Sequence, residues 1–189
     1  DLNFDDFFNR VNSELIGKIT NLASRGMQML NKLDSKLGTV PEEGKTLIRK
    51  AQEKAPIIAD FFENREFSKA MVEIRNLADA ANRYFDEKKP WDSIKSDQET
   101  TRGTLTTVVN LFRIIAVFLK PILPSYCQKV EDLLGEDPFH WDSHQVILEN
   151  RPIKHFEHLA KRVQKDNIDK MIASSMETPG ECASEKPGA

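Results

Sequence analysis

The stretch LTTVVNLFRIIAVFL, residues 105–119, is the most apolar part of the chain and decides its fold. Its apolar side chains recur at steps of three and four, which predicts a helix that begins near Asp97 and continues through this stretch. Because little polar face remains, we expect this helix to be the buried centre of a helix bundle. The longest apolar run, residues 108–119, is interrupted by Asn110 and Arg113. It is well short of the ~20 residues that a membrane span needs, so no membrane partner is expected.

Helical periodicity continues on both sides of the central stretch. Predicted helices cover about residues 3–32, 45–62, 64–88, 125–134 and 154–172, with a kink or break at Pro56 and a stop at Gly135. Residues 136–153 follow no period and are expected to be irregular. The sequence therefore predicts an all-α protein, with an antiparallel bundle of about five helices over residues 1–153. A C-terminal appendage helix over residues 154–173 and a flexible linker or tail over residues 174–189 complete the predicted organisation.

Charge and cysteine content limit the classes of partner and compartment. Lys and Arg number 27 against 30 Asp and Glu, a formal net charge of −3 over 189 residues. Bulk charge attraction therefore cannot hold a nucleic acid, which would have to be bound by a few placed side chains. Cys127 and Cys182 are far apart, so no disulfide is expected and a reducing, cytoplasmic setting is the default. The chain begins at Asp1, directly before a helix pattern, which indicates a segment of a longer protein.

Catalytic and metal-binding motifs are not found in the sequence. No GxSxG, GxGxxG, P-loop or HExxH pattern occurs. No cysteine pair accompanies the four histidines, which are more often surface or capping residues: His140, His144, His155 and His158. Asp79, Asp86 and Glu87 bracket Arg83, an arrangement that indicates ion pairs along a helix. The sequence thus predicts no catalytic residue and no metal site.

Asn21 and Arg25 are the first feature that points to binding. They are four residues apart on the first predicted helix, so their side chains project side by side. An amide beside a guanidinium offers hydrogen-bond donors and an acceptor that suit the edges of unstacked bases. Gly17 and Gly26 are expected to leave this face open to a ligand. The alternative for the pair is an ordinary solvated helix face.

Trp91, directly after Pro90, is the second such feature. We expect it in a short polar loop, between Lys88, Lys89 and Asp92, with Pro90 fixing the local backbone. A stiff, partly exposed indole suits stacking on a single-stranded base. The alternative is a tryptophan that lies over the hydrophobic core.

Three runs of sequence carry a family resemblance. They read DFxxRVNxELxxKxxNLASR (residues 6–25), FxxREFxKAxxEIxxLADxANRYxDExxPW (residues 62–91) and NLFRxxxxxLKPxLP (residues 110–124). Together they resemble the α-helical anticodon-binding domain that follows the catalytic domain of methionyl-tRNA synthetases, over about residues 2–172. The related synthetases for Ile, Val, Leu and Cys share the bundle but not NLASR together with ANRYxDExxPW. The HIGH and KMSKS signatures of a catalytic domain are absent from the sequence.

The resemblance implies a role in translation. Such a domain recognises the CAU anticodon of tRNA(Met), so that the parent methionine–tRNA ligase attaches methionine to it. Carried over by motif, Asn21 and Arg25 contact anticodon bases. Trp91, positioned by Pro90, stacks on the first of them, a cytosine. Gly17 stands where some members have a second asparagine, so that contact is expected to be missing or replaced.

The expected partners follow from the same resemblance. They are the tRNA(Met) anticodon stem-loop and the catalytic domain of the same polypeptide, on which residues 154–173 pack back; DNA is not expected. ATP and methionine are expected to bind that catalytic domain, so no cofactor is expected in this segment. The alternative is a stand-alone helical module for protein–protein interaction, in which Trp91 and the Asn21/Arg25 pair contact another protein.

Overall fold

Helix α7 (Gln98–Leu119) is the centre of the computed structural model, which describes residues 3–176. Asp97 caps it, because the Asp97 carboxylate accepts a hydrogen bond from the Thr100 amide at 3.1 Å. Every residue of α7 from Gly103 to its end is buried. By length and composition α7 could cross a membrane, but 94% of its most apolar 18-residue window lies inside the protein. It is therefore the core helix that the apolar stretch predicts.

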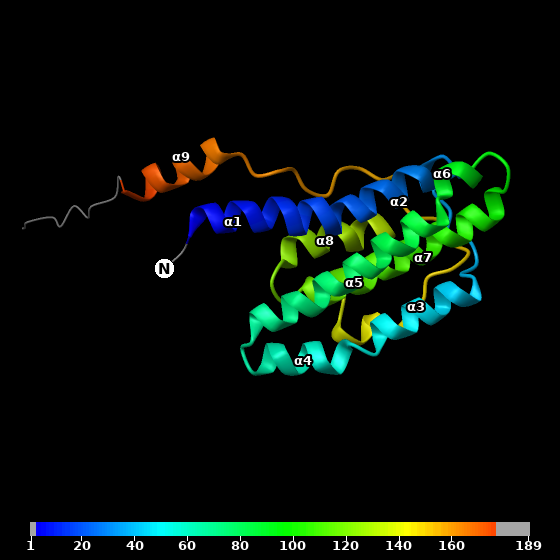
Figure 1. Ribbon diagram of the computed structural model, residues 1–189, viewed down its shortest axis with the longest axis horizontal. Helices are drawn as coiled ribbons and strands as arrows, with labels where there is room; N and C mark the ends of the chain where they lie inside the picture. The colour runs from blue at the N-terminus through cyan, green and yellow to red at the C-terminus, as the bar shows by residue number, and fades with distance from the viewer. Residues whose placement is uncertain (1–2, 177–189) are drawn as a thin grey trace, which may run out of the picture.

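A continuous helical rod packs on α7 at its C-terminal end and projects beyond the bundle at its N-terminal end (Figure 1). It consists, in order, of α1 (Phe4–Arg10), the π-helical segment η1 (Val11–Thr20) and α2 (Asn21–Asn31). Asn3 caps the rod, because its side chain accepts a hydrogen bond from the Asp6 amide at 3.0 Å. The single helix predicted for residues 3–32 is confirmed, but its middle part is wound with the wider i→i+5 hydrogen-bond pattern.

The two glycines of this rod serve its packing and winding. Gly26 is buried against α7, and a Cβ atom there would lie 3.1 Å from a methyl group of Val108. Gly17 lies inside η1, where a Cβ atom would lie 3.2 Å from the carbonyl oxygen of Asn12. The prediction that both glycines open the binding face to a ligand is wrong for Gly26, because its face is the core.

Five further helices complete the bundle around α7 (Figure 1): α3 (Glu42–Gln52), α4 (Ala55–Glu63), α5 (Phe67–Lys88), α6 (Pro90–Ser93) and α8 (Pro124–Leu134). The break predicted at Pro56 falls just before it, at Glu53 and Lys54. Proline fits the first turn of α4, where its missing N–H has no helical partner to lose. Gly135 ends α8 with a φ of 63°, as predicted. The all-α bundle is confirmed.

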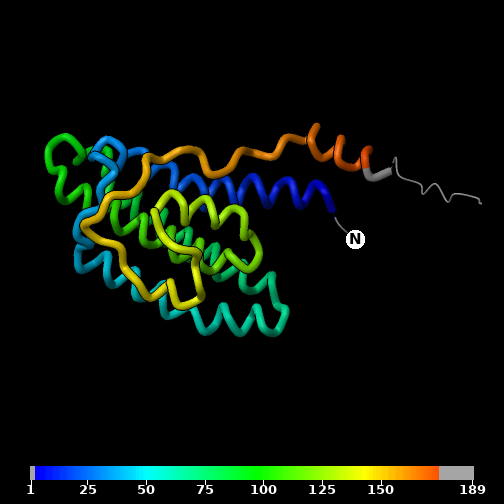
Figure 2. Tube along the Cα trace, turned by 180° about the vertical axis from the view of Figure 1, so that it is seen from behind, coloured from blue at the N-terminus to red at the C-terminus, as the bar shows by residue number. Residues whose placement is uncertain are grey.

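After α8 the chain returns along the bundle with little regular structure (Figure 2). This return segment, residues 136–164, contains the 3₁₀ turn η2 (Trp141–Gln145) and one isolated bridge between Lys36 and Pro152. The appendage helix α9 (Lys165–Met176) follows, beside α1 and beyond the rest of the bundle. The predicted tail lies, from residue 177 onward and with Cys182, outside the described residues.

The helix predicted for residues 154–172 is wrong over residues 154–164, where the chain is not helical. Buried apolar residues recur here every third position, a spacing that also fits an extended chain with three residues per turn: Ile153, Phe156 and Leu159. Side-chain amides hold the extended form. Asn12 binds both the N–H and the C=O of Val163, at 2.9 and 3.0 Å, and Asn31 accepts from the Phe156 amide at 3.1 Å.

Arg113 fixes the start of the return segment against α7. Its side chain is only 2% exposed and donates two hydrogen bonds to the Glu136 carboxylate, at 2.5 and 2.7 Å. It also donates to the backbone carbonyls of Ser143 and Val146, at 2.7 and 3.0 Å. The buried guanidinium supplies hydrogen bonds to a buried carboxylate and to two loop carbonyls. These bonds explain the presence of an arginine in an otherwise apolar helix.

We predict that Arg113→Met lowers the free energy of unfolding by ~3–5 kcal/mol, because it leaves the nearly buried Glu136 carboxylate without its partner. Adding Glu136→Leu to this variant removes the unpaired charge and restores part of the loss. Denaturant unfolding of the two variants measures both effects. A single variant as stable as the wild type would contradict this account of the ion pair.

Candidate nucleic-acid interface

Asn21 and Arg25 lie one turn apart on α2, as their spacing predicts. The intervening Leu22 and Ala23 are buried in the core and turn the pair toward the edge of the bundle. The Asn21 residue is exposed, whereas the Arg25 residue is half-buried. The two side chains therefore differ: one is free in solvent and the other is fixed by its neighbours.

Three groups from α5 and α6 hold the Arg25 guanidinium. Its Nη2 atom donates to a carboxylate oxygen of Asp86 at 2.8 Å. Its central carbon lies 4.5 Å from the centre of the Phe85 ring and 5.8 Å from that of the Trp91 ring. Both distances are within the ~6 Å over which a cation is attracted to an aromatic face. Arg25 and Trp91, far apart in sequence, thus belong to one cluster.

Trp91 lies in the short helix α6 and not in the predicted loop. The chain turns from α5 into α6 at Lys89, which is in the left-handed region with φ 45° and ψ 55°. Pro90 starts α6 and is buried, which anchors this turn. Trp91 packs on the buried Phe85, with ring centroids 5.7 Å apart, and is still 44% exposed. One part of its ring contacts the core, as the lid interpretation requires, and another part is open to solvent.

Two of the three carboxylates around Arg83, Asp79 and Asp86, pair with the helical rod and not with Arg83 itself. Asp79 binds Lys18 at 2.8 Å, and Asp86 binds Arg25 at 2.8 Å. The predicted ion pairing along α5 is therefore wrong. The two ion pairs connect α5 to the rod, because Asp79 and Asp86 lie on the side of α5 that faces the rod. Phe85 and Asp86 are thus members of the cluster that sequence reasoning missed.

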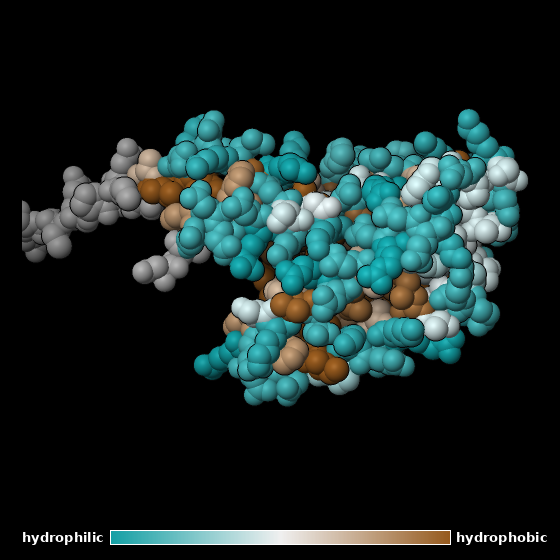
Figure 3. Space-filling model, viewed as in Figure 1, coloured by the Kyte–Doolittle hydropathy of each residue, from teal (hydrophilic) through white to brown (hydrophobic). Residues whose placement is uncertain are grey.

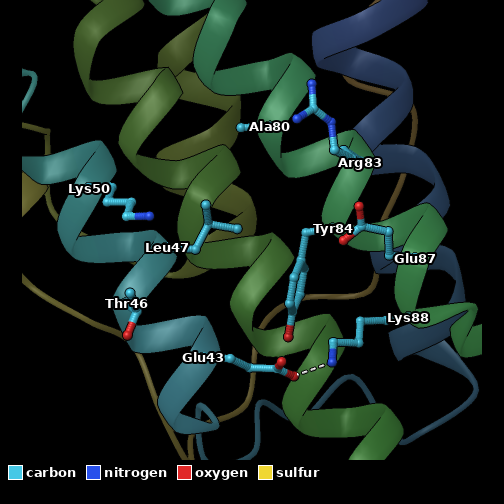
Figure 4. A pocket seen from close by; sticks show the side chains of 9 residues that line it. All are labelled: Glu43, Thr46, Leu47, Lys50, Ala80, Arg83, Tyr84, Glu87 and Lys88. Atoms are coloured by element: carbon cyan, nitrogen blue, oxygen red, sulfur yellow. Dashed lines mark ion pairs between the residues drawn. The ribbon is translucent and has the colours of Figure 1, made fainter.

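Arg83 lies in a polar cavity of about 350 Å³ between α3 and α5 (Figure 4). An ion pair between Glu43 and Lys88 spans its lower edge, and Lys50 faces it from α3. Within residues 3–176 Arg83 forms no ion pair. Tyr84 forms the inner wall, and burial raises the pKa of its hydroxyl. The cavity is on the α3 side of α5, whereas the Arg25–Trp91 cluster is on the α2 side.

The other candidates from the sequence have structural roles. The His144 ring bonds the Trp141 carbonyl at 2.6 Å, and His155 contacts Asn31. Cys127 is a buried free thiol, and burial raises its pKa to about 12. Over the described part of the chain, no three His, Cys, Asp or Glu side chains are grouped as a metal ion would require.

The helix bundle, with the arginine–aromatic cluster at one end, is consistent with the helical anticodon-binding domains that the sequence motifs resemble. The family model for the anticodon-binding domain of methionyl-tRNA ligase matches residues 35–166, and the chain belongs to this family. The matched range contains Pro90 and Trp91, whereas Asn21 and Arg25 precede it. The resemblance found in the sequence motifs is therefore confirmed.

Relatives named methionine–tRNA ligase agree with this family. The chain is 50% identical over 190 residues to that of Bdellovibrio bacteriovorus, covering 100% of this chain and 28% of the relative. It is 38% identical to that of Ralstonia nicotianae, covering 94% of this chain and 26% of the relative. The chain thus spans little more than a quarter of these relatives.

Solved structures of Mycobacterium tuberculosis methionyl-tRNA synthetase share the fold. The apo form matches with a TM-score of 0.80 and 25% identity, over 86% of this chain and 35% of that one. The complex with methionyl-adenylate matches with a TM-score of 0.76 and 25% identity, over 82% and 33%. The chain therefore corresponds to about a third of the length of these solved proteins.

We predict that Trp91→Ala costs ~1–2 kcal/mol of unfolding free energy, less than the ~3–5 kcal/mol of a fully buried aromatic, because Trp91 is 44% exposed. Trp141→Ala is the matched control and should cost more, since Trp141 contacts the rings of Phe62, Phe118 and His144. Denaturant unfolding compares the two variants. A larger loss at Trp91 than at Trp141 would show that Trp91 is chiefly a lid on the core.

Proposed function

We propose that this chain is the tRNA-recognition module of a methionine–tRNA ligase and that it recognises the CAU anticodon of tRNA(Met). The observation that carries the proposal is the cluster in which Arg25, Phe85 and Trp91 lie together, with Asp86 fixing the guanidinium. Family membership supports it, since the matching model is an anticodon-binding domain.

Trp91 provides the stacking platform in this proposal. Phe85 supports its ring from the core and Pro90 holds its backbone, so the indole is already in place before RNA arrives. A platform fixed in advance loses little side-chain freedom on binding. Stacking of the first anticodon base, a cytosine, on the exposed part of the ring contributes ~1–3 kcal/mol.

Arg25 and Asn21 supply base-edge contacts beside that platform. Asp86 takes one N–H of the guanidinium, and the ring of Phe85 orients its plane. The remaining N–H groups of Arg25 are donors for the O2 and N3 acceptors on the Watson–Crick edge of cytosine. The exposed Asn21 amide, one turn away, adds a donor and an acceptor. Because the net charge is −3, these placed groups and not bulk attraction set the affinity.

The whole enzyme extends beyond this module. We infer that the longer polypeptide attaches methionine to tRNA(Met), and that ATP and methionine bind its catalytic domain while this segment needs no cofactor. The chain covers 28% of its Bdellovibrio relative, which leaves room for such a domain. We place the protein in the cytoplasm, where translation occurs, with no DNA or membrane partner.

We predict that Arg25→Gln weakens binding of a CAU anticodon stem-loop by about tenfold to a hundredfold, the ~1–3 kcal/mol of a lost base-edge contact. It should also reduce the preference over a stem-loop altered at the first anticodon base. Arg10→Gln is the control, because Arg10 is also an ion-paired arginine on the same rod, bonded to Asp6. Titration of both stem-loops is the measurement. Equal behaviour of the two variants would assign Arg25 to a solvated helix face.

We predict that Trp91→Ala also weakens stem-loop binding by about tenfold to a hundredfold, through the lost stacking contact. In the full-length enzyme it should impair aminoacylation and leave formation of methionyl-adenylate nearly normal, because that reaction does not involve the anticodon. Parallel assays of the two steps separate these effects. Unchanged affinity per folded molecule would contradict stacking on Trp91.

A further inference from the structure

Trp91 belongs to a helix that is too short to hold its own direction. Helix α6 spans four residues, and the Ile94 N–H closes its one turn on the Pro90 carbonyl at 3.0 Å. Forming one helical turn fixes several backbone angles for a single hydrogen bond, so such a turn is unstable by itself. Contacts with the rest of the protein must therefore hold α6, and with it the indole, in place.

A network of three hydrogen bonds ties the end of α6 to the start of α7. The Ser93 hydroxyl lies 2.7 Å from that of Thr101, and the Thr101 hydroxyl donates to the Asp97 carbonyl at 2.8 Å. Because a hydroxyl has one hydrogen, Ser93 is the donor in its bond with Thr101. The Asp97 N–H closes the network on the Ser93 carbonyl at 2.8 Å.

The network reaches into the protein on its Thr101 side. Thr101 is 0% exposed, and Ser93 is half-buried. Figure 3 shows a pale surface of intermediate hydropathy, which serine and threonine share, at the end of the molecule that holds α6. Hydrogen bonds that are shielded from water are costly to lose, because the freed groups find no solvent partner. The network therefore fixes α6 more firmly than an exposed serine could.

The network also fixes the position of Trp91 relative to Arg25. Arg25 belongs to α2, which packs on α7 where Gly26 meets Val108. Trp91 belongs to α6, which the network joins to the same helix α7. The distance of 5.8 Å between the guanidinium carbon and the centre of the Trp91 ring thus depends on two separate attachments to α7.

Packing on Phe85 holds Trp91 close to the core without fixing its direction. Apolar contact is non-directional, whereas a hydrogen bond requires a defined distance and angle. Pro90 fixes the beginning of α6, and the bond between Ser93 and Thr101 fixes its end. Together they determine which part of the indole faces solvent.

We propose that Ser93 and Thr101 are positioning residues for recognition of the first anticodon base. The proposal rests on the proposed function, in which Trp91 stacks on that base and Arg25 contacts its edge. Stacking alone accepts every base, because every base has an aromatic face. Selection of cytosine requires its edge to meet Arg25 while its face lies on Trp91. Ser93 and Thr101 maintain that relation through Trp91 and do not bind the base themselves.

A double-mutant cycle in the full-length polypeptide tests the proposal. The wild type, Ser93→Ala, Trp91→Ala and the double variant are titrated with the CAU stem-loop and with a stem-loop altered at the first anticodon base. Affinity is expressed per folded molecule, and coupling between the two positions appears as a non-additive effect. Ser96→Ala is the matched control, because the exposed Ser96 hydroxyl bonds within the same turn, to the Ser93 carbonyl at 3.3 Å.

We expect Ser93→Ala to weaken binding of the CAU stem-loop by about threefold to tenfold, the effect of one lost hydrogen bond, and to reduce the preference for it. In the Trp91→Ala background it should have no further effect, and Ser96→Ala should bind like the wild type. Thr101→Val should reproduce Ser93→Ala, whereas Thr101→Ser, which keeps the hydroxyl, should retain the wild-type affinity.

Equal losses from Ser93→Ala in both backgrounds would overturn the proposal, because the network would then act on the fold and not through Trp91. No loss from Ser93→Ala, while Trp91→Ala weakens binding, would overturn it and leave the proposed function standing. Unchanged affinity of Trp91→Ala itself would contradict stacking, and this proposal with it.

A second measurement contains no RNA. Tryptophan is replaced by fluorotryptophan, and the fluorine NMR signal of position 91 is identified by its loss in Trp91→Phe. The shift of this signal between ordinary and heavy water measures the exposure of the indole. We expect Ser93→Ala, but not Ser96→Ala, to increase that shift. An unchanged signal in Ser93→Ala would overturn the positioning role independently of anticodon recognition.

Discussion

A helix that is buried on every side needs protein against each of its faces, and α7 is such a helix. Regular helices cover most of it, and the return segment covers the remainder. The order of elements follows from this requirement. The chain must first enclose α7 with α2, α3 and α5, and then come back after α8 to close the last side. The Arg25–Trp91 cluster lies at one end of α5, one of the helices placed by this arrangement.

Covering a helix with irregular chain creates a second requirement, because buried backbone N–H and C=O groups must find partners. In this protein the side chains of asparagine residues supply those partners. Asn110 binds the N–H and the C=O of Leu148, at 2.7 and 2.8 Å, and Asn12 binds those of Val163. A side-chain amide with one donor and one acceptor thus takes the place of a neighbouring strand. These two asparagines of the helices hold the return segment.

The sequence predicted most of the helices because apolar side chains at steps of three and four report burial directly. It failed at residues 154–164, where a spacing of three belongs to an extended chain and the deciding partner, Asn31, is more than a hundred residues away. Spacing and motifs predicted four site residues, Asn21, Arg25, Pro90 and Trp91, and the structure brings Arg25 and Trp91 together. Their contact with RNA stays a prediction. Asp86 was missed, since a helix sequence alone does not tell which neighbour a carboxylate will face.

The π-helical segment η1 separates α1 from α2, the part of the rod that carries Arg25. Each residue of an ordinary helix turns the following side chains by ~100°. Adding or removing one residue in η1 would therefore rotate α1 relative to α2, while each part kept its own local structure. The rotation of α1 about the rod axis relative to Arg25 on α2 is thus set by the length of this one segment. A substitution in η1 that keeps its length would leave this rotation unchanged, whereas the insertion or deletion of one residue would change it.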